Sequence, residues 1–574
     1  MMAITTIFIY LFYKKYSKKL HPLKHILAVI FSLCCVIGNS YQEVSSWNLV
    51  FSTVPLFLIS IMQVFCYYYL IKTIFCFIDT LLERKRTIKV NTNNKLVKLF
   101  QEHPFLFSLI VMLLFWLIYM IAFYPLILSK DPSFQIKQFF NVKTKYIDYV
   151  IPLSDKVNLT NHHPVFHTML LGGSIKLGRL LGSDNLGLFI YAIMQSITLA
   201  SSLAYTIYYL YKKKKSFCSV KAFTKVFILL MIYSLVPMFP FYAMSAVKDT
   251  LYTAVIIFFV ITLFTILDDK ETKTSKYIVL LLLSILLYLL RNNGIYVVVG
   301  TILVLAIYRR KEFIYLTAVL LFVISTYISY DKILLPALKI PAGSIRETLS
   351  VPFQQTARYV KEHNSEVTEE EKNIIDRVLE YDTLAKRYNP VHADSVKNKF
   401  NKDASDEDLR NYFSVWGKQL LKHPTTYIQA TLNNYYGYVY PECKITEFTT
   451  KYIVNNDTRL NGTKKFNYKY ISKYKGLRKI VKKILETIQK VPVISWITNI
   501  AFNVWAIILM IVYMCYTKKY RYIICMMPIV SIILVNFASP VNAYFRYAMP
   551  YIFSMPLILS IFLDIVKEKG KGKK

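Results

Sequence analysis

One aspartate and two histidines in this sequence have the residue types and spacing for chemistry on a hydroxyl group. Asp131 lies in Leu128-Ser-Lys-Asp131-Pro-Ser133, directly after a long apolar run, and His162-His163-Pro164 follows about thirty residues later. A carboxylate can take a proton as a general base, and imidazoles hydrogen-bond phosphate or sugar oxygens or ligate a metal ion. Singly, Asp131 has the ordinary alternative of a turn residue before a proline.

Three cations, Lys248, Arg291 and Arg546, stand at the ends of later apolar runs. Each alone fits an anchor whose charged head reaches the lipid headgroups. Ionisable groups at membrane depth usually mark a functional cavity, however, and these cations accompany an acid and two histidines. Together the six side chains suit the handling of a lipid-linked phosphate.

The elements that carry these residues are membrane helices. The chain has 574 residues, of which 55% are hydrophobic and 16% aromatic, and its mean hydropathy is +0.38. Apolar runs near the length that crosses roughly 30 Å of hydrocarbon recur along it, so we predict an all-α polytopic membrane protein with about 12–13 transmembrane helices. The runs lie at 22–39, 48–79, 104–128, 187–210, 224–241, 250–267, 277–290, 294–308, 313–330, 497–516, 521–538 and 546–566, with 2–13 a doubtful first one.

Lys and Arg concentrate in short segments that all fall on one side of these spans, the side expected to be cytoplasmic. The segments are 14–19, 84–86, 212–215, 270–276, 309–311, 518–521 and the tail 567–574. Much of the net charge of +36 sits there, which favours contact with anionic membrane lipids and not with nucleic acid. We therefore predict a multi-pass protein of the cell membrane with Asp131 on the extracytoplasmic face.

The predicted organisation has four parts. Residues 1–103 form N-terminal membrane helices, 104–330 a catalytic membrane core with a first external loop at 129–186, 331–496 an extracytoplasmic, mainly α-helical domain, and 497–574 C-terminal membrane helices with a basic cytoplasmic tail. In the external domain, a capping box at Thr368–Glu371 predicts one helix start, and a second helical stretch is predicted to begin near Ser405–Asp408. The segment 433–441, dense in Tyr and Asn, suits stacking on sugars or an interfacial aromatic belt.

Several of these features resemble the GT-C fold glycosyltransferases, and more narrowly a bacterial family of uncharacterised membrane proteins related to protein mannosyltransferases and to the aminoarabinose transferases of lipid A. They are the carboxylate in the first large external loop, the downstream His-Pro, Lys248-Asp249, Arg291-Asn292-Asn293-Gly294, Ser539-Pro540, Phe545-Arg546-Tyr547 with Pro550, and the segment 349–358. The resemblance spans about residues 104 to 566.

The resemblance implies transfer of a sugar from a polyprenyl-phosphate carrier to an extracytoplasmic acceptor, with inversion. The acceptor would be a cell-wall polymer, polysaccharide, glycolipid or protein. Asp131 would be the general base, and Arg291 would stabilise the leaving phosphate. The residues implied in binding the donor phosphate and sugar are His162, His163, Lys248, Asp249, Asn292 and Arg546.

Metal dependence is left open. Many GT-C enzymes carry two neighbouring acids in the first loop, whereas Asp131 has no adjacent Asp or Glu, and Asp148 and Asp155 lie well beyond it. A divalent cation, Mg²⁺ or Mn²⁺, could bind Asp131 with His162 and His163, but a mechanism without metal or other cofactor is favoured.

Two other classes fit the same residues. A transporter or lipid flippase usually shows internal repeats and a mid-span site, and neither is evident in this sequence. A polysaccharide polymerase or ligase would differ in using a pyrophosphate-linked donor.

Overall fold

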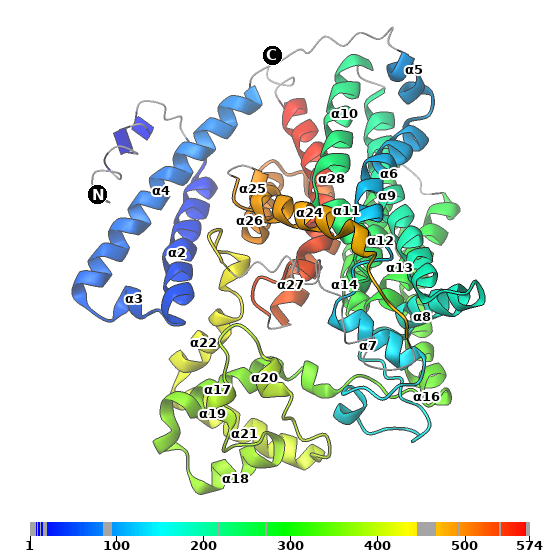
Figure 1. The fold of residues 1–574 in the computed structure, drawn as a ribbon. Helices are drawn as coiled ribbons and strands as arrows, with labels where there is room; N and C mark the ends of the chain where they lie inside the picture. The colour runs from blue at the N-terminus through cyan, green and yellow to red at the C-terminus, as the bar shows by residue number, and fades with distance from the viewer. Residues whose placement is uncertain are drawn as a thin grey trace.

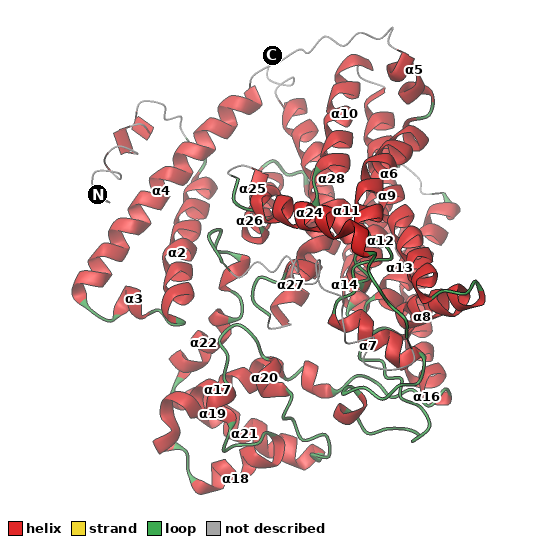
Figure 2. Ribbon diagram, in the orientation of Figure 1, coloured by secondary structure: helices red, strands yellow, loops and turns green. Residues whose placement is uncertain are grey.

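Every regular element in the described part of the chain is a helix, as Figure 2 shows, with only isolated β-bridges elsewhere. The structure is a computed structural model that describes residues 7, 10, 11, 13, 14, 20–83, 95–215, 219–269, 273–444, 466–491, 494–538 and 541–569. Most of the doubtful span 2–13, the basic segment 84–86, the last five residues of the tail and Ser539-Pro540 lie outside the described residues.

Eight helical segments in these ranges are long and apolar enough to cross a membrane. They are α2 (Pro22–Val44), α4 (Val54–Glu83), α6 (Pro104–Ala122), α9 (Asp184–Lys215), α12 (Lys248–Asp268), the segment Arg310–Ala337 that contains α15 (Phe313–Ile328) and α16 (Leu335–Ala337), α27 (Tyr520–Ala538) and α28 (Phe545–Lys569). Four apolar helices are shorter: α10 (Ser219–Leu235), α13 (Thr274–Leu290), α14 (Gly294–Tyr308) and α26 (Ile500–Tyr516). The twelve predicted runs coincide with these elements, which confirms an all-α chain with several helices of spanning length.

Two predicted boundaries are wrong. The run 104–128 is helical only to Ala122, because Pro125 lacks the N–H that a helix needs and disfavours helical backbone at Tyr124. The apolar residues after it, including Ile127, form a buried extended loop. Conversely, the helical segment expected to end at 330 continues through Ala337.

Helix α12 lies inside the bundle of long apolar helices (Figure 1). It packs against α9, α13, α27 and α28, and nearly all of its residues are buried. A helix that is apolar on every side is stable only when other helices surround it. The first residues of α12 are therefore held inside the bundle, close to the first residues of α28.

The predicted first external loop contains two helices that pack onto the bundle, α7 (Lys130–Phe139) and α8 (Val165–Leu180). Helix α8 approaches α9 so closely that a Cβ added at Gly178 would lie 2.2 Å from the backbone nitrogen of Gly187. Glycine is needed there because two backbones meet.

A smaller helical unit with its own apolar core lies at the same end of the molecule as α7 and α16 (Figure 1). It contains α17 (Ser350–His363), α18 (Glu369–Val378), α19 (Leu384–Arg387), α20 (Asp394–Lys397), α21 (Asp406–Lys422) and α22 (Pro424–Asn433). The predicted capping box at Thr368 is confirmed as the start of α18. The second predicted helix start is also confirmed, and Ser405 forms a capping box there at the start of α21. The tyrosines of 433–441 are buried, so they form no exposed surface for stacking on sugars.

Candidate functional site

Two buried loops bring Asp131 next to the start of α12. The backbone N–H of Ile127 donates to the carbonyl of Met244 at 2.8 Å, and that of Ala246 donates to the carbonyl of Ile127 at 3.0 Å. Helix α7 begins three residues after Ile127, and α12 begins two residues after Ala246. The pairing therefore sets Asp131, in the first turn of α7, beside Lys248 and Asp249.

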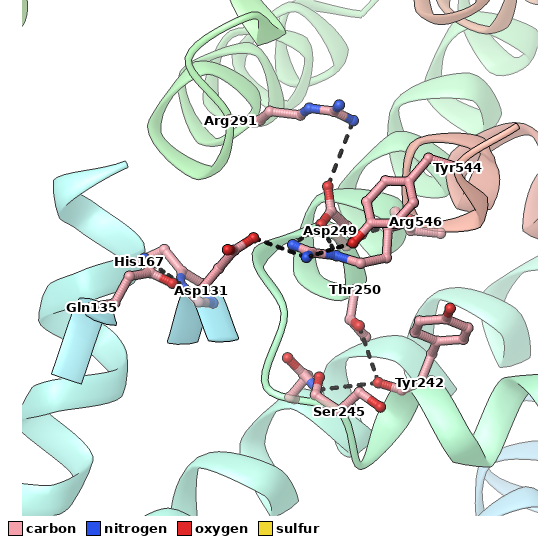
Figure 3. A network of polar contacts seen from close by, with 12 residues as sticks. Asp131, Gln135, His167, Tyr242, Ser245, Asp249, Thr250, Arg291, Tyr544 and Arg546 are labelled. Atoms are coloured by element: carbon pink, nitrogen blue, oxygen red, sulfur yellow. Dashed lines mark hydrogen bonds and ion pairs between the residues drawn. The ribbon is translucent and has the colours of Figure 1, made fainter. Parts of the chain in front are cut away.

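Arg546 joins two carboxylates from distant parts of the chain (Figure 3). Its Nη1 donates to Asp131 Oδ2 at 2.9 Å, and its Nε and Nη2 donate to Asp249 Oδ2 at 3.0 and 2.8 Å. Arg546 and Asp249 are buried, whereas the Asp131 side chain is 33% exposed. Asp131 Oδ2 is thus occupied, while Asp131 Oδ1 accepts no hydrogen bond from the described residues.

The second oxygen of Asp249 faces another cation. Asp249 Oδ1 lies 3.6 Å from Arg291 Nη1, too far for a good hydrogen bond, and no described donor bonds to it. The Arg291 guanidinium also lies over the rings of Tyr252 and Tyr547, at 5.6 and 4.8 Å from their centroids. Arg291 is therefore buried and held by one carboxylate and two aromatic faces.

Lys248 differs from the two arginines. Its ammonium makes no hydrogen bond or ion pair with any residue in the described part of the chain, although it is close enough to Asp131 for its charge to affect that carboxyl. Three cations against two carboxylates leave one excess positive charge in this cluster. The N-terminal ends of α12 and α28 add partial positive charge at the same place.

The charge balance keeps Asp131 ionised. Burial alone would raise the pKa of the Asp131 carboxyl, but the charge and hydrogen bond of Arg546 and the charge of Lys248 outweigh it, so this pKa lies below its usual value. The group is a carboxylate at neutral pH and can accept a proton at Oδ1.

The two predicted histidines lie beside this cluster. The ring of His162 stacks on Tyr146 with centroids 4.1 Å apart, and its Nδ1 lies 3.9 Å from Glu347 Oε1. Burial lowers the pKa of His162 to about 4, and burial with the charges of nearby cations lowers the pKa of His163 well below 6.5. His163 is buried and both of its ring nitrogens lack a hydrogen-bond partner among the described residues. A buried imidazole without a protein partner usually hydrogen-bonds a water molecule or a ligand.

A buried polar chain behind Asp131 was missed from the sequence. His167 Nε2 lies 2.7 Å from the Tyr191 hydroxyl, which donates to Gln195 Oε1 at 2.9 Å, and Gln195 Nε2 donates to the carbonyls of Ala243 and Ser245. On the other side, Gln135 Nε2 lies 3.0 Å from His167 Nδ1.

Only one assignment of donors and acceptors satisfies all the hydrogen bonds of this polar chain. Because the Gln195 amide donates to backbone carbonyls and the Tyr191 hydroxyl donates to Gln195, His167 Nε2 must carry the proton and Nδ1 must accept from Gln135. Burial lowers the pKa of His167 to about 3, which agrees with a neutral ring. The residue pairs 131 and 135, 163 and 167, and 191 and 195 are each one helical turn apart. This spacing is the sequence pattern from which the buried polar chain could have been predicted.

The remaining predicted residue, Asn292, binds backbone. Its Nδ2 donates to the carbonyl of Asn161 at 2.7 Å, and the Asn161 N–H donates to the carbonyl of Pro341. Asn292 therefore fixes the loop that carries the two histidines, and the same loop is tied to the segment entering the helical unit.

The helical unit contributes a second charged group at the edge of the site. Lys397 Nζ lies 2.6 Å from Glu347 Oε2 and 2.9 Å from Asp394, and the Arg346 guanidinium covers the Tyr149 ring at 3.3 Å. Sequence reasoning did not identify these residues. They border the site on the side of His162.

No set of metal ligands surrounds Asp131. Among the described residues, one group of three or more His, Cys, Asp or Glu side chains has donor atoms close enough to hold an ion, and it is His363, Glu366 and His423 in the helical unit. Asp249, from another helix, is the second carboxylate near Asp131, and Arg546 lies between the two.

In the described part of the chain, the fold and the site thus define an all-α protein with eight helical segments of membrane-spanning length and a buried acid and cation cluster at helix ends. Residues 14–574 match the model of DUF6020, a family of unknown function, and the chain belongs to this family. No curated protein and no solved structure matches the chain.

Proposed function

We propose that this protein is a multi-pass membrane glycosyltransferase of the GT-C type, which moves a sugar from a polyprenyl-phosphate carrier to an acceptor outside the cytoplasm. The observation that carries the proposal is the position of Asp131 at the ends of apolar helices. Its free Oδ1 stands beside Lys248, which has no carboxylate partner, and near the unbonded imidazole of His163. These are the groups needed to deprotonate a hydroxyl and to bind a phosphate.

Asp131 would be the general base. Its Oδ2 is fixed by Arg546 and its side chain is partly exposed, so Oδ1 can meet an acceptor hydroxyl that arrives from the aqueous side. As the acceptor oxygen attacks the anomeric carbon, the proton passes to Oδ1 and the bond from that carbon to the phosphate oxygen breaks.

Lys248 and Arg291 would stabilise the leaving phosphate. Arg546 is saturated by two carboxylates, which favours a positioning role for it. Lys248 has its full charge available, and Arg291 makes only a long contact to Asp249. Fixed positive charge where negative charge develops lowers the barrier directly.

An apolar cavity of about 530 Å³ supports a lipid-linked donor. It is lined by side chains of α6 and α9 and by Tyr124, which begins the loop leading to Asp131, with Ile471 and Tyr474 at one edge. Next to it, α24 (Lys475–Ile488) lies across the bundle in Figure 1, and its Arg478 donates to the carbonyl of Ala122. A Lys-rich amphipathic helix of this kind is typical of the membrane interface.

The positive-inside rule supports an extracytoplasmic site, with the helical unit on the acceptor side. A transporter is less favoured because Asp131, Lys248, Arg291 and Arg546 all lie at helix ends and not in mid-span. A polymerase or ligase with a pyrophosphate-linked donor is the remaining alternative.

The test is replacement of the chromosomal gene by Asp131→Asn, with lipid extracts analysed by mass spectrometry. We expect polyprenyl-phosphate sugar to accumulate as in a deletion strain, because loss of a general base costs about 10²-fold or more in rate. Asp148→Asn is the matched control, since Asp148 is in the same segment, 54% exposed and paired only with Lys143. An Asp131→Asn strain with a wild-type lipid profile, at normal protein level, would refute the base assignment. Accumulation of a pyrophosphate-linked oligosaccharide would favour the polymerase instead.

A further inference from the structure

Two histidines and a glutamate meet in the helical unit, away from the site around Asp131. His423 Nε2 lies 3.0 Å from Glu366 Oε2, and His363 Nδ1 lies 3.4 Å from Glu366 Oε1. One donor atom from each of the three residues lies within 4.8 Å of the others. The two imidazoles stack with centroids 3.7 Å apart and planes inclined by 11°.

The three residues come from two separate parts of the unit. Helix α17 ends at His363, and the following turn carries Glu366 three residues later. His423 joins α21 to α22, immediately before Pro424. A ligand held by all three would therefore connect the end of α17 to the junction of α21 and α22.

Hydrogen bonds orient His363 for coordination. Its Nε2 lies 3.0 Å from Thr426 Oγ1, and the Thr426 hydroxyl donates to Glu362 Oε2 at 3.2 Å. Because the hydroxyl proton is used on Glu362, His363 Nε2 is the donor to Thr426, which leaves the lone pair of Nδ1 facing Glu366. A metal-binding histidine usually donates its other ring N–H in this way.

The donor set matches a transition metal. Two imidazoles and a carboxylate are the ligands of many zinc sites, and Zn–N and Zn–O bonds near 2.0–2.1 Å place donor atoms about 3.3 Å apart in a tetrahedron. The two imidazoles contact different oxygens of Glu366, and one donor atom from each residue lies within 4.8 Å of the others. Because the two rings are stacked, one imidazole must turn and the ligands must draw closer when an ion binds. Burial is partial, with side-chain exposures of 21% for His363 and 27% for His423, so an ion can reach the ligands from solvent.

We infer that His363, Glu366 and His423 form a binding site for Zn²⁺ or a divalent ion of similar ligand preference, with water in the open position. Lys422 Nζ, 2.9 Å from Glu366 Oε2, occupies part of the site and must move when the ion binds. The hydrogen bond between His423 Nε2 and Glu366 Oε2 is also given up, and any proton on that nitrogen is released, when the ring coordinates the ion. The ion stabilises the helical unit by binding only its folded form.

The test uses the full-length protein in detergent, stripped with a chelator and titrated with ZnCl₂ against a fluorescent zinc indicator. We expect about one ion per chain at high affinity, and a loss of about 100-fold or more for Glu366→Gln and for the double variant His363→Gln/His423→Gln. His392→Gln is the matched control, because His392 is in the same unit and outside the cluster. Lys422→Met should bind zinc more tightly, since it removes the competing ammonium.

Melting curves distinguish a loss of zinc binding from a failure of the variant to fold. In chelator each variant should melt as the wild type does, and zinc should raise the melting temperature of wild type, His392→Gln and Lys422→Met only. The inference is overturned if stripped wild type takes up no zinc at micromolar concentration, or if the double variant binds zinc as tightly as wild type. It is likewise overturned if Lys422→Met abolishes binding.

Discussion

Replacing Arg546 by Met should destabilise the protein by about 3 kcal/mol. Arg546 makes two hydrogen bonds to Asp249, whose side chain has no exposed surface, and breaking a buried ion pair from one side costs about 3–5 kcal/mol. The lower end applies because Arg291 remains 3.6 Å from Asp249 Oδ1. The lost contact to Asp131 adds little, since that carboxylate is a third exposed.

The measurement is unfolding in mixed micelles with a rising fraction of SDS, followed by tryptophan fluorescence. The double variant Asp249→Asn/Arg546→Met should recover about 2 kcal/mol, because both buried charges are gone and only Arg291 has lost its carboxylate. Arg310→Met, at an exposed position, should change stability by less than about 0.5 kcal/mol. The reasoning fails if the double variant is as unstable as Arg546→Met alone, because Asp249 would then not depend on Arg546.

Three further outcomes are expected. Lys248→Met should lower transfer to the acceptor by about 10²-fold with little change in stability, as measured on reconstituted vesicles and by SDS unfolding, because its ammonium has no carboxylate partner. Burial lowers the pKa of His162 to about 4 from about 6.5 in the unfolded chain, which then binds more protons between these values. The contribution of His162 to the free energy of unfolding is therefore fully present above pH 6.5 and falls by about 3 kcal/mol toward pH 4. The variant His162→Gln should lose this part of the acid sensitivity. An unchanged dependence of stability on pH in that variant would contradict the assignment. Gly178→Ala should cost about 2 kcal/mol because its Cβ meets the backbone of Gly187, whereas Gly173→Ala in the same helix, with nothing within 4 Å, should be neutral or stabilising.

The helices were predictable from the sequence because length and apolar character are local properties. The start of α18 followed from the capping box at Thr368, where the N-cap residue and the residue three positions later decide the outcome, and the start of α21 was predicted near Ser405. The end of α6 at Ala122 was missed since the apolar run continues to Leu128, and the effect of Pro125 was not weighed against it. An apolar run indicates that residues are buried but not that they are helical, and the buried residues after α6 form an extended loop.

The site was predictable as a set of residues and not as a geometry. Asp131, Lys248, Arg291 and Arg546 were identified by charge at the ends of apolar runs, and the structure brings them together. Asp249 was predicted to bind the donor, and its position between two arginines is revealed by no local pattern. His167 was missed because a histidine inside an apolar stretch is indistinguishable from a core residue until its partners are known.

Arg546 also explains why the site depends on the last helix. Three of its hydrogen bonds reach Asp131 and Asp249, which are 415 and 297 residues away along the chain. Until α28 packs against α12, Asp249 has no hydrogen-bonding cation and only the long contact to Arg291. A carboxylate buried in that state is costly, so the start of α12 gains its full stability only when α28 is in place. The hydrogen bond from Arg546 to Asp131 likewise forms only when α28 is in place, so the last helix of the chain sets the orientation of both carboxylates.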